Sequence, residues 1–397
     1  MKKLNSYEKM IISLRSLVIF RNILMNEAVV KLLELLSSID KSIIERVNSY
    51  SAFVSCLFRD SEDLSRYLSE IVLQDENIYV LKRASNERIG DFLTECLVNE
   101  LKIIESISLL SAKEIKAHIG YESYLPEWKI SPIDFLSCYM DRMEKIQTLG
   151  FGIYSKYHAF CIKNNSIVPV KSPDRVSLAE LKGYETQRKT IIDNTLALLK
   201  GKPAANVLLY GDAGTGKSST VKAVVNEFKD RGLRLVEVTK KQFGYLPDLV
   251  DSIGKNPLKF ILFIDDLSFA EENDDFYALK AVLEGSVSAK TNNMVVYATG
   301  NRRHLIKETF SDRDEDDVHR NETIQELVSL SARFGLTVGF FRPGKKLYLD
   351  IVRKLKEQYK LNINDDELEI QAERFAISGR SPRTARQLIE YLKSIEQ

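Results

Sequence analysis

The amino-acid sequence predicts an α/β protein whose parallel-sheet core lies between two helical regions. Three observations support this fold class. Apolar residues in positions 1–150 recur at helical spacing, short apolar runs alternate with helical stretches from about residue 176, and a helical pattern returns after Pro343. The chain has 397 residues, enough for two or three domains of about 150 residues each.

The composition is ordinary for a globular protein. Hydrophobic residues make up 44% and charged residues 28%, which excludes a largely disordered chain. The formal net charge is +1 and basic residues cluster only in pairs such as Arg302-Arg303, so no feature indicates binding to nucleic acid mainly through phosphates. The four cysteines lie far apart without a C-x-x-C pair, which favours neither a zinc site nor a redox pair.

No segment of the sequence indicates a membrane span or a secretory signal. The apolar runs, of which Phe260–Ile264 is one of the longest, stay far below the roughly 18 residues that cross a bilayer. Glu8, Lys9 and Arg15 interrupt any apolar signal segment near the start of the chain. We therefore expect a cytoplasmic protein.

Residues 1–150 predict a helical N-terminal domain. Ser131-Pro132 predicts a helix start, because serine caps free amides and proline suits the first helical position. Gly150 predicts a helix end. No motif indicates a role for this domain. One apolar stripe has the i, i+3, i+4, i+7, i+8 spacing of a buried helix face, and it consists of Leu64, Tyr67, Leu68, Ile71 and Val72.

Residues 151–175 predict a hairpin and a linker. Two short strand-like runs, Tyr157–Ile162 and Ser166–Val170, flank the turn-forming residues Lys163-Asn164-Asn165. Ser172-Pro173-Asp174 has the composition of a linker.

Residues 176–342 predict the parallel sheet with its helices. The apolar runs here are continuous rather than alternating, which is typical of strands covered on both faces. Residues 343–397 predict helices. The candidate strands of the sheet are Val207–Tyr210, Leu233–Val238, Phe260–Ile264, Met294–Ala298 and Leu336–Phe341.

A complete phosphate-binding loop (P-loop) follows the first of these strands. It matches G-x-x-x-x-G-K-[ST] and opens a helix, which is the setting that the motif requires. Backbone amides of such a loop surround the phosphates, Lys217 reaches the β- and γ-phosphates, and the Ser218 hydroxyl binds Mg²⁺. The sequence therefore predicts a site for ATP and Mg²⁺. The predicted nucleotide-binding residues are Gly211, Asp212, Ala213, Gly214, Thr215, Gly216, Lys217, Ser218 and Ser219.

Two adjacent carboxylates end the candidate strand Phe260–Ile264. Asp265 stands where P-loop enzymes hold the Mg²⁺ shell, so Ser218 and Asp265 are the predicted metal-binding pair. Asp266 stands where hydrolysing members usually carry a glutamate that polarises the attacking water. Aspartate is one methylene shorter, and Asp266 either acts as this base or only caps the end of the strand.

Several segments between about residue 155 and the end of the chain match a known family. They are Leu181–Gln187, Leu208–Gly211, Ile264–Phe269, Ala298–Arg303 and Ser329–Leu336. With its P-loop and its Asp265-Asp266 strand, the chain resembles the AAA+ ATPases, and more closely a bacterial AAA+ family catalogued only as a domain of unknown function. The resemblance implies an AAA+-type core over residues 176–342 and a C-terminal helical lid over residues 343–397.

The resemblance implies two further site residues. Asn301 occupies the sensor-1 position, where an asparagine orients the water and contacts the γ-phosphate; an ordinary turn residue is the alternative. Arg333 resembles the arginine finger that AAA+ subunits insert into a neighbouring site. Ala332 departs from the aspartate that is common before this arginine, and Arg313 and Arg320 are alternatives for the finger.

The lid is expected to add an arginine. Ser381-Pro382 starts a helix whose apolar residues share one face, while Arg383 and Arg386 lie on the opposite face. Arg386 resembles the sensor-2 arginine of AAA+ lids, with Arg383 as the alternative. Tyr184 matches the place where AAA+ proteins bracket the adenine.

The implied function is that of a Mg²⁺-dependent ATPase with Asp266, Asn301, Arg333 and Arg386 as its catalytic set. The resemblance implies a nucleotide-dependent homo-oligomer that remodels or loads an unknown protein or nucleic-acid client. A nucleotide-gated binding switch with little or no hydrolysis is the alternative, because Asp266 replaces glutamate. A P-loop small-molecule kinase is a third possibility, against which Asn301 and the helical lid weigh.

Overall fold

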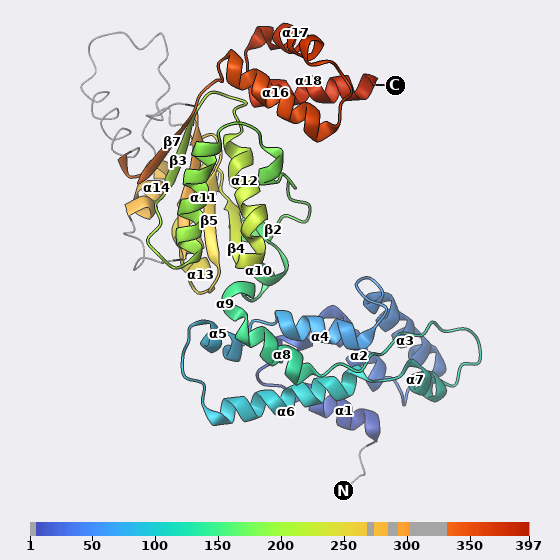
Figure 1. Cartoon of the computed structure of the whole chain (residues 1–397). Helices are drawn as coiled ribbons and strands as arrows, with labels where there is room; N and C mark the ends of the chain where they lie inside the picture. Colours follow the sequence, from blue (N-terminus) through green and yellow to red (C-terminus); the bar gives the residue numbers. More distant parts are fainter. Residues whose placement is uncertain (1–4, 268–273, 285–292, 302–331, 397) are drawn as a thin grey trace. The chain divides into compact units, whose positions relative to one another are not determined.

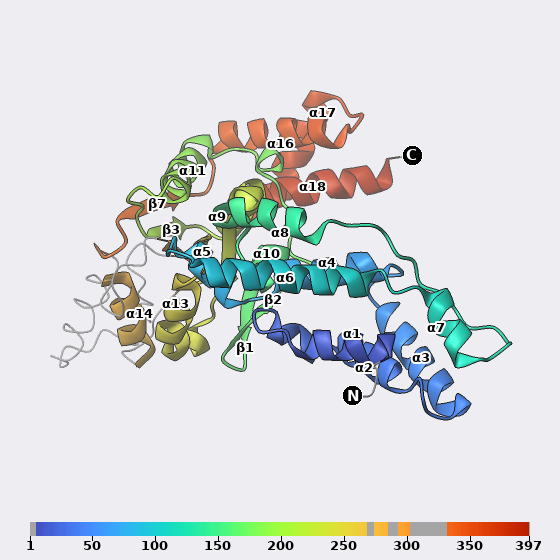
Figure 2. The ribbon, with the colours of Figure 1, turned by 90° about the horizontal axis from the view of Figure 1, so that it is seen from below.

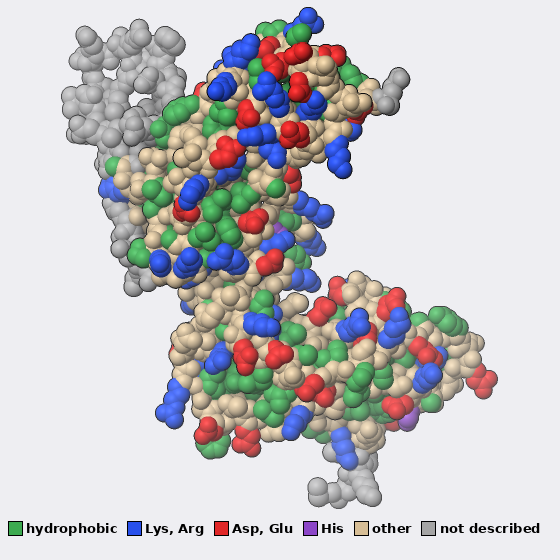
Figure 3. Space-filling model, in the orientation of Figure 1, with side chains coloured by type: hydrophobic (Ala, Val, Ile, Leu, Met, Phe, Trp, Pro, Cys, Tyr) green, Lys and Arg blue, Asp and Glu red, His purple; other side chains and the backbone are tan. Residues whose placement is uncertain are grey.

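The structure, a computed structural model, describes residues 5–267, 274–284, 293–301 and 332–396 (Figure 1). The chain forms two compact units, Met1–Lys156 and Tyr157–Gln397. On the face shown in Figure 3, charged side chains of both signs are interspersed, in agreement with the formal net charge of +1.

The first unit is helical, as predicted. The predicted apolar stripe lies on α4, where four of its residues are buried and Ile71 is half-buried. Gly150, with φ +65°, follows the short helix α9 and ends it. The helices of this unit are α1 (Ser6–Arg15), η1 (Arg21–Met25), α2 (Glu27–Ser37), α3 (Ile43–Leu57), α4 (Leu64–Gln74), α5 (Ile78–Ala84), α6 (Asp91–Ser108), α7 (Ala112–Ile119), α8 (Phe135–Glu144), α9 (Ile146–Leu149) and α10 (Ile153–Lys156).

The predicted helix start at Ser131-Pro132 is wrong. α8 begins at Phe135, and the carboxylate of Asp134 caps it by accepting the amide of Ser137 at 2.8 Å. The Ser131 hydroxyl instead donates to the Asp63 carboxylate at 2.5 Å. The Ser131 side chain, which the local pattern assigns to a helix cap, thus bonds to a residue from a distant part of the chain.

A buried carboxylate organises the N-terminal segment of this unit. Glu100 on α6 is 5% exposed and accepts hydrogen bonds of 2.7–3.1 Å from the three consecutive backbone amides of residues 18–20. The Cys96 thiol donates to the same carboxylate at 3.3 Å. A buried carboxylate requires such donors, and they in turn fix the path of the chain between α1 and η1.

We expect Glu100→Ala to destabilise the first unit by about 2–4 kcal/mol, because buried amides then lack an acceptor. Trp128, the only tryptophan of the chain, is buried in this unit and reports its urea unfolding by fluorescence. The control is Glu95→Ala, at an exposed position of the same helix. Equal urea midpoints for the two variants would contradict this role of the Glu100 carboxylate.

The second unit contains a seven-stranded sheet of order β2-β1-β4-β5-β6-β3-β7. All neighbouring strands run parallel except β1 and β2. The five predicted core strands are confirmed as β3 to β7, with ends that differ by one or two residues. The strands are β1 (Ala159–Lys163), β2 (Ser166–Pro169), β3 (Val207–Gly211), β4 (Leu233–Glu237), β5 (Lys259–Ile264), β6 (Met294–Gly300) and β7 (Leu336–Phe340).

The hairpin expected next to a linker is part of this sheet. β1 and β2 pair around Asn164-Asn165, and β1 also runs parallel to β4. Phe160 and Ile162 on β1 are buried. The sequence pattern indicates the two strands, whereas the pairing of β1 with β4 involves residues that lie far away in the sequence.

Helices cover both faces of the sheet (Figures 1 and 2). α11 (Glu185–Leu199) and α12 (Lys217–Phe228) share an apolar core with one face, and α13 (Leu246–Gly254) and α14 (Asp274–Glu284) contact each other on the other face. The lid comprises α16 (Lys345–Tyr359), α17 (Asp365–Phe375) and α18 (Pro382–Ile395). The apolar face predicted for α18 is buried against α16, except for Ile395 at its end.

Candidate nucleotide-binding site

The P-loop lies where β3 ends and α12 begins. Gly211, at φ +127°, brings the loop so close to β7 that a Cβ there would lie 2.1 Å from the carbonyl oxygen of Phe340. Gly216, at φ +92°, takes the left-handed conformation directly before α12. Both positions need glycine. They form a sharp strand-to-helix turn at the positive end of the α12 dipole, where anions bind well.

Lys217 is buried against its own loop. Its ammonium group donates to the carbonyl oxygens of Gly211 at 2.7 Å and Asp212 at 2.8 Å. Burial lowers the pKa of Lys217, and the nearby carboxylates of Asp212, Asp265 and Asp266 act in the opposite direction. Through its two hydrogen bonds, the Lys217 ammonium group lies within the loop, beside the space where a P-loop binds phosphates.

Ser218 and Asp265 lie together at the start of α12. The Ser218 hydroxyl donates to the Asp265 carboxylate at 2.7 Å. Such hard oxygen groups suit Mg²⁺, which usually binds one or two protein groups and completes its ligands with water and nucleotide phosphates. The residues present thus fit this ion.

Asp266 and Asn301 are also in contact. Asn301 Nδ2 donates to Asp266 Oδ1 at 3.2 Å. Asp266 follows β5 and Asn301 follows β6, and these two strands pair in parallel with Ile264 opposite Ala298. The Asp266 backbone is left-handed, with φ +52°.

Thr299 is a site residue that the motifs do not predict. It is 2% exposed, and its hydroxyl donates to Asp265 Oδ1 at 2.5 Å and accepts the Asp266 amide at 2.9 Å. The sequence does hold a signal for it. Once Ile264 of β5 is placed opposite Ala298 of β6, the residues that follow them, Asp265 and Thr299, become neighbours. The motifs alone do not contain this pairing of β5 with β6.

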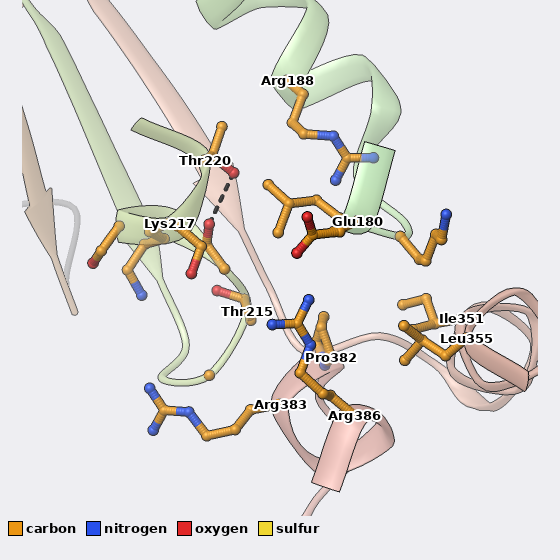
Figure 4. A pocket seen from close by; sticks show the side chains of 16 residues that line it. Glu180, Arg188, Thr215, Lys217, Thr220, Ile351, Leu355, Pro382, Arg383 and Arg386 are labelled. Carbon is orange, nitrogen blue, oxygen red and sulfur yellow. Dashed lines mark hydrogen bonds between the residues drawn. The ribbon is translucent and has the colours of Figure 1, made fainter. Parts of the chain in front are cut away.

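A pocket of about 330 Å³ lies between the P-loop and the lid (Figure 4). Glu180, Leu181 and Arg188 line it from the core, and Ile351 and Leu355 line it from the lid. Apolar and charged groups thus share one cavity, as in sites for small polar ligands. Of the predicted P-loop residues, the pocket is lined by Gly214, Thr215, Gly216, Lys217, Ser218 and Ser219, and not by Gly211, Asp212 or Ala213.

The Asp212 carboxylate faces the hinge to the lid. It accepts the backbone amide of Arg342 at 2.8 Å, and the Arg342 guanidinium lies 3.9 Å from it. α16 begins three residues after Arg342, at Lys345. A P-loop residue therefore anchors the chain at the point where it enters the lid.

Both candidate lid arginines line the pocket. The Arg383 amide donates to the carbonyl oxygen of Gly214 at 3.2 Å, and the Arg383 charge contributes to the lowered pKa of Lys217. In Figure 4, Arg386 points toward Thr215 and Glu180, whereas Arg383 extends along the tip of the P-loop. Of the two arginines, Arg383 is thus the one whose backbone is hydrogen-bonded to the P-loop.

Tyr184 does not line the pocket, in contrast to its expected place beside the adenine. Its ring packs against Phe340 with centroids 5.3 Å apart, and its hydroxyl donates to the carbonyl oxygen of Phe341 at 2.5 Å. Burial raises the pKa of Tyr184 to about 12. The tyrosine fastens the start of α11 to the end of β7, and Leu181 and Lys182, a few residues earlier, reach the pocket instead.

Arg333 lies three residues before β7, at the amino end of that strand. The P-loop lies at the other end, where Gly211 is opposite Phe340. The register from Leu336 to Phe340 separates the two ends by about 13 Å at 3.3 Å per residue. Within one chain, Arg333 and the P-loop thus face opposite edges of the sheet. Arg313 and Arg320 lie outside the described residues.

Comparisons with known proteins identify the family of the chain. Residues 155–396 match the family described as "Protein of unknown function (DUF815)". The chain belongs to this family. Its predicted AAA+ P-loop core with a helical N-terminal region and C-terminal helices is likewise confirmed.

Shorter stretches are similar to curated proteins. The chain is 37% identical over 73 residues to the Replication factor C large subunit of Staphylothermus marinus, which covers 18% of this chain and 16% of that protein. It is 33% identical over 113 residues to the 26S proteasome regulatory subunit 6B homolog of Schizosaccharomyces pombe, which covers 25% of this chain and 29% of that protein. The chain thus spans less than a third of either relative.

A solved structure with a similar chain is the RuvB Holliday junction branch migration motor of Thermotoga maritima. It is 18% identical with a TM-score of 0.38, and the match covers 54% of this chain and 63% of that chain.

Within the described ranges of this chain, every helix is too short or too polar to span a bilayer.

We expect Lys217→Ala to weaken ATP binding by about tenfold to a hundredfold, because a charge-assisted contact of about 1.5–3 kcal/mol is lost. The measurement is calorimetric titration with ATP and Mg²⁺. Lys222→Ala is the control, since Lys222 lies on the same helix but does not line the pocket. Equal affinity of Lys217→Ala and wild type would falsify the P-loop assignment.

Proposed function

We propose that this protein is a Mg²⁺-dependent ATPase of the AAA+ type that acts on a protein or nucleic-acid client. The main support is the meeting of Ser218, Asp265 and the Asp266–Asn301 pair beside a complete P-loop. These groups come from three separate segments of the chain. Their proximity therefore depends on the fold and not only on the P-loop motif.

Nucleotide binding would use the P-loop and the pocket. Lys217 would exchange the two carbonyl oxygens that it now contacts for phosphate oxygens, which are stronger acceptors. Ser218 and Asp265 would hold Mg²⁺, which when bound neutralises phosphate charge. Leu181, Ile351 and Leu355 offer an apolar surface for the base.

Hydrolysis would use Asp266 and Asn301. The asparagine amide donates to the Asp266 carboxylate and so orients the group that would accept a proton from water. Arg386, whose side chain points into the pocket from α18, would offset charge on the phosphoryl group from the lid. Arg383 lines the pocket from the same helix and is the alternative for this role.

A nucleotide-gated switch is the second candidate function. Two contacts connect the P-loop to the lid, from Gly214 to Arg383 and from Asp212 to Arg342. Nucleotide binding could therefore change the position of the lid without hydrolysis. Release of γ-phosphate distinguishes the two functions, because a switch releases phosphate only at the background rate even in concentrated protein.

We expect Asp266→Asn to keep ATP affinity and to lower turnover by about 10²–10⁴-fold, since the shape stays while the base is removed. Phosphate release and calorimetric ATP binding are measured on the same samples. Asp251→Asn, an exposed substitution on α13, is the control. Turnover at the wild-type rate would mean that Asp266 only caps the end of the strand.

Catalysis would also require a neighbouring subunit. Arg333 lies at the edge of the sheet opposite the P-loop of its own chain, so as a finger it would serve another chain. An arginine supplied in this way neutralises charge in the transition state. The expected assembly is a homo-oligomer in which each site combines one P-loop with the Arg333 of the next copy.

Mixing Arg333→Ala with Lys217→Ala should restore part of the ATPase activity that each variant lacks. In a mixed oligomer, some sites combine an intact P-loop with an intact finger. The control is a mixture of Lys217→Ala with Asp266→Asn. Both residues belong to the P-loop side of the site, so every site in this mixture carries one of the two defects and no activity is restored. Constant specific activity on dilution together with no rescue would leave Arg333 as a local structural residue.

A further inference from the structure

One buried hydroxyl beside the site takes no part in the mechanism above. Thr299 lies near the end of β6 and is 2% exposed. Three hydrogen bonds join it to residues 265–267. Its hydroxyl donates to Asp265 Oδ1 at 2.5 Å and accepts the Asp266 amide at 2.9 Å, and its carbonyl oxygen accepts the Leu267 amide at 2.7 Å.

The direction of these bonds is fixed by proton count. A threonine hydroxyl has one proton. Because the Asp266 amide can only donate, the Thr299 hydroxyl oxygen accepts this hydrogen bond. The single hydroxyl proton is then donated to Asp265. Ser218 donates to the same Asp265 oxygen, Oδ1. Both hydroxyls therefore orient this carboxylate through the same oxygen.

The same residue supports a strained turn. Asp266 has φ +52°, a left-handed conformation that residues other than glycine adopt uncommonly. Such conformations persist where surrounding contacts impose them. Here Thr299 holds the amide of Asp266 and the amide of the following residue, while Asn301 holds the Asp266 carboxylate. The turn aims the Asp266 side chain at Asn301.

We propose that Thr299 is a positioning residue, which orients Asp265 for Mg²⁺ and holds Asp266 in its left-handed turn. The inference rests on the proposed ATPase function and deepens it. Thr299 acts through the two aspartates and touches neither nucleotide nor metal. Valine in its place has nearly the same shape but removes the hydroxyl that accepts the Asp266 amide, and it leaves Asp265 with Ser218 as the one remaining donor of these two. Serine keeps the hydroxyl.

The test compares Thr299→Val and Thr299→Ser with Thr195→Val. Thr195 is a suitable control because it is fully buried in the same unit, with its hydroxyl 2.8 Å from the carbonyl oxygen of Ile191 and from the Tyr297 hydroxyl. It does not line the pocket. For each variant, the affinity for a non-hydrolysable ATP analogue is measured with and without Mg²⁺, together with ATP turnover and the thermal midpoint.

We expect Thr299→Val to lose about 10–100-fold both in turnover and in the gain of affinity that Mg²⁺ provides, as is usual when a group that orients a metal ligand is removed. Affinity without Mg²⁺ should stay within about twofold, because the P-loop is intact. Thr299→Ser should restore both properties. Thr195→Val should lower the thermal midpoint without changing the effect of Mg²⁺.

Two results would overturn the inference: an unchanged Mg²⁺ effect in Thr299→Val, or the same loss in Thr195→Val. Should Thr299→Val not fold, Thr299→Ala paired with Thr299→Ser gives the same comparison. A wild-type protein that binds the analogue without any Mg²⁺ effect would instead contradict the proposed function and the inference with it. The two failures are therefore distinguished by the wild-type measurement.

Discussion

The site depends on one constraint, the parallel pairing of β6 with β5 on one side and with β3 on the other. Parallel strands end at the same edge of a sheet, so β3 brings the P-loop, β5 the two aspartates and β6 Thr299 and Asn301 to one place. A shift of one residue in the β5–β6 register would turn Asp265 and Thr299 toward opposite faces. The last paired residues before the site, Ile264 and Ala298, are both buried, so the apolar packing of these strands helps to position the polar groups that follow.

Sequence patterns predicted those features that depend on contiguous residues. The P-loop, the five core strands and the apolar face of α18 all follow from local spacing. The end of one strand indicated Asp265 and Asp266, whereas Asn301 was implied by the resemblance to the AAA+ ATPases. The features that these patterns do not reveal depend on partners that are distant in the sequence. Tyr184 bonds to the carbonyl oxygen of Phe341 and does not line the pocket, and β1 pairs with β4. Thr299 escaped prediction for the same reason, since its role exists only once β5 and β6 are paired.

The lid is connected to the P-loop at two points. Its entry is anchored where Asp212 accepts the Arg342 amide, and its last helix begins next to Gly214, whose carbonyl oxygen accepts the Arg383 amide. Gly214 leaves little room there, because a Cβ would lie 3.1 Å from Ser381 Oγ and 3.3 Å from Arg383 Cβ. A change in the P-loop backbone would therefore act on the lid through direct contacts. Such coupling serves a hydrolysing enzyme and a binding switch equally well, so it does not decide between them.

The aspartate at position 266 has a backbone explanation that the sequence alone does not reveal. Taken as a shorter replacement for glutamate, it favours a switch that does not hydrolyse. In the structure its backbone is left-handed and is held by Thr299. Aspartate is one of the few side chains other than glycine that enter this conformation readily, because a short polar group can bond locally, and glutamate lacks this advantage. The turn that Thr299 imposes therefore favours aspartate whatever the reaction. The exchange of glutamate for aspartate is then a consequence of the turn and carries little weight against hydrolysis.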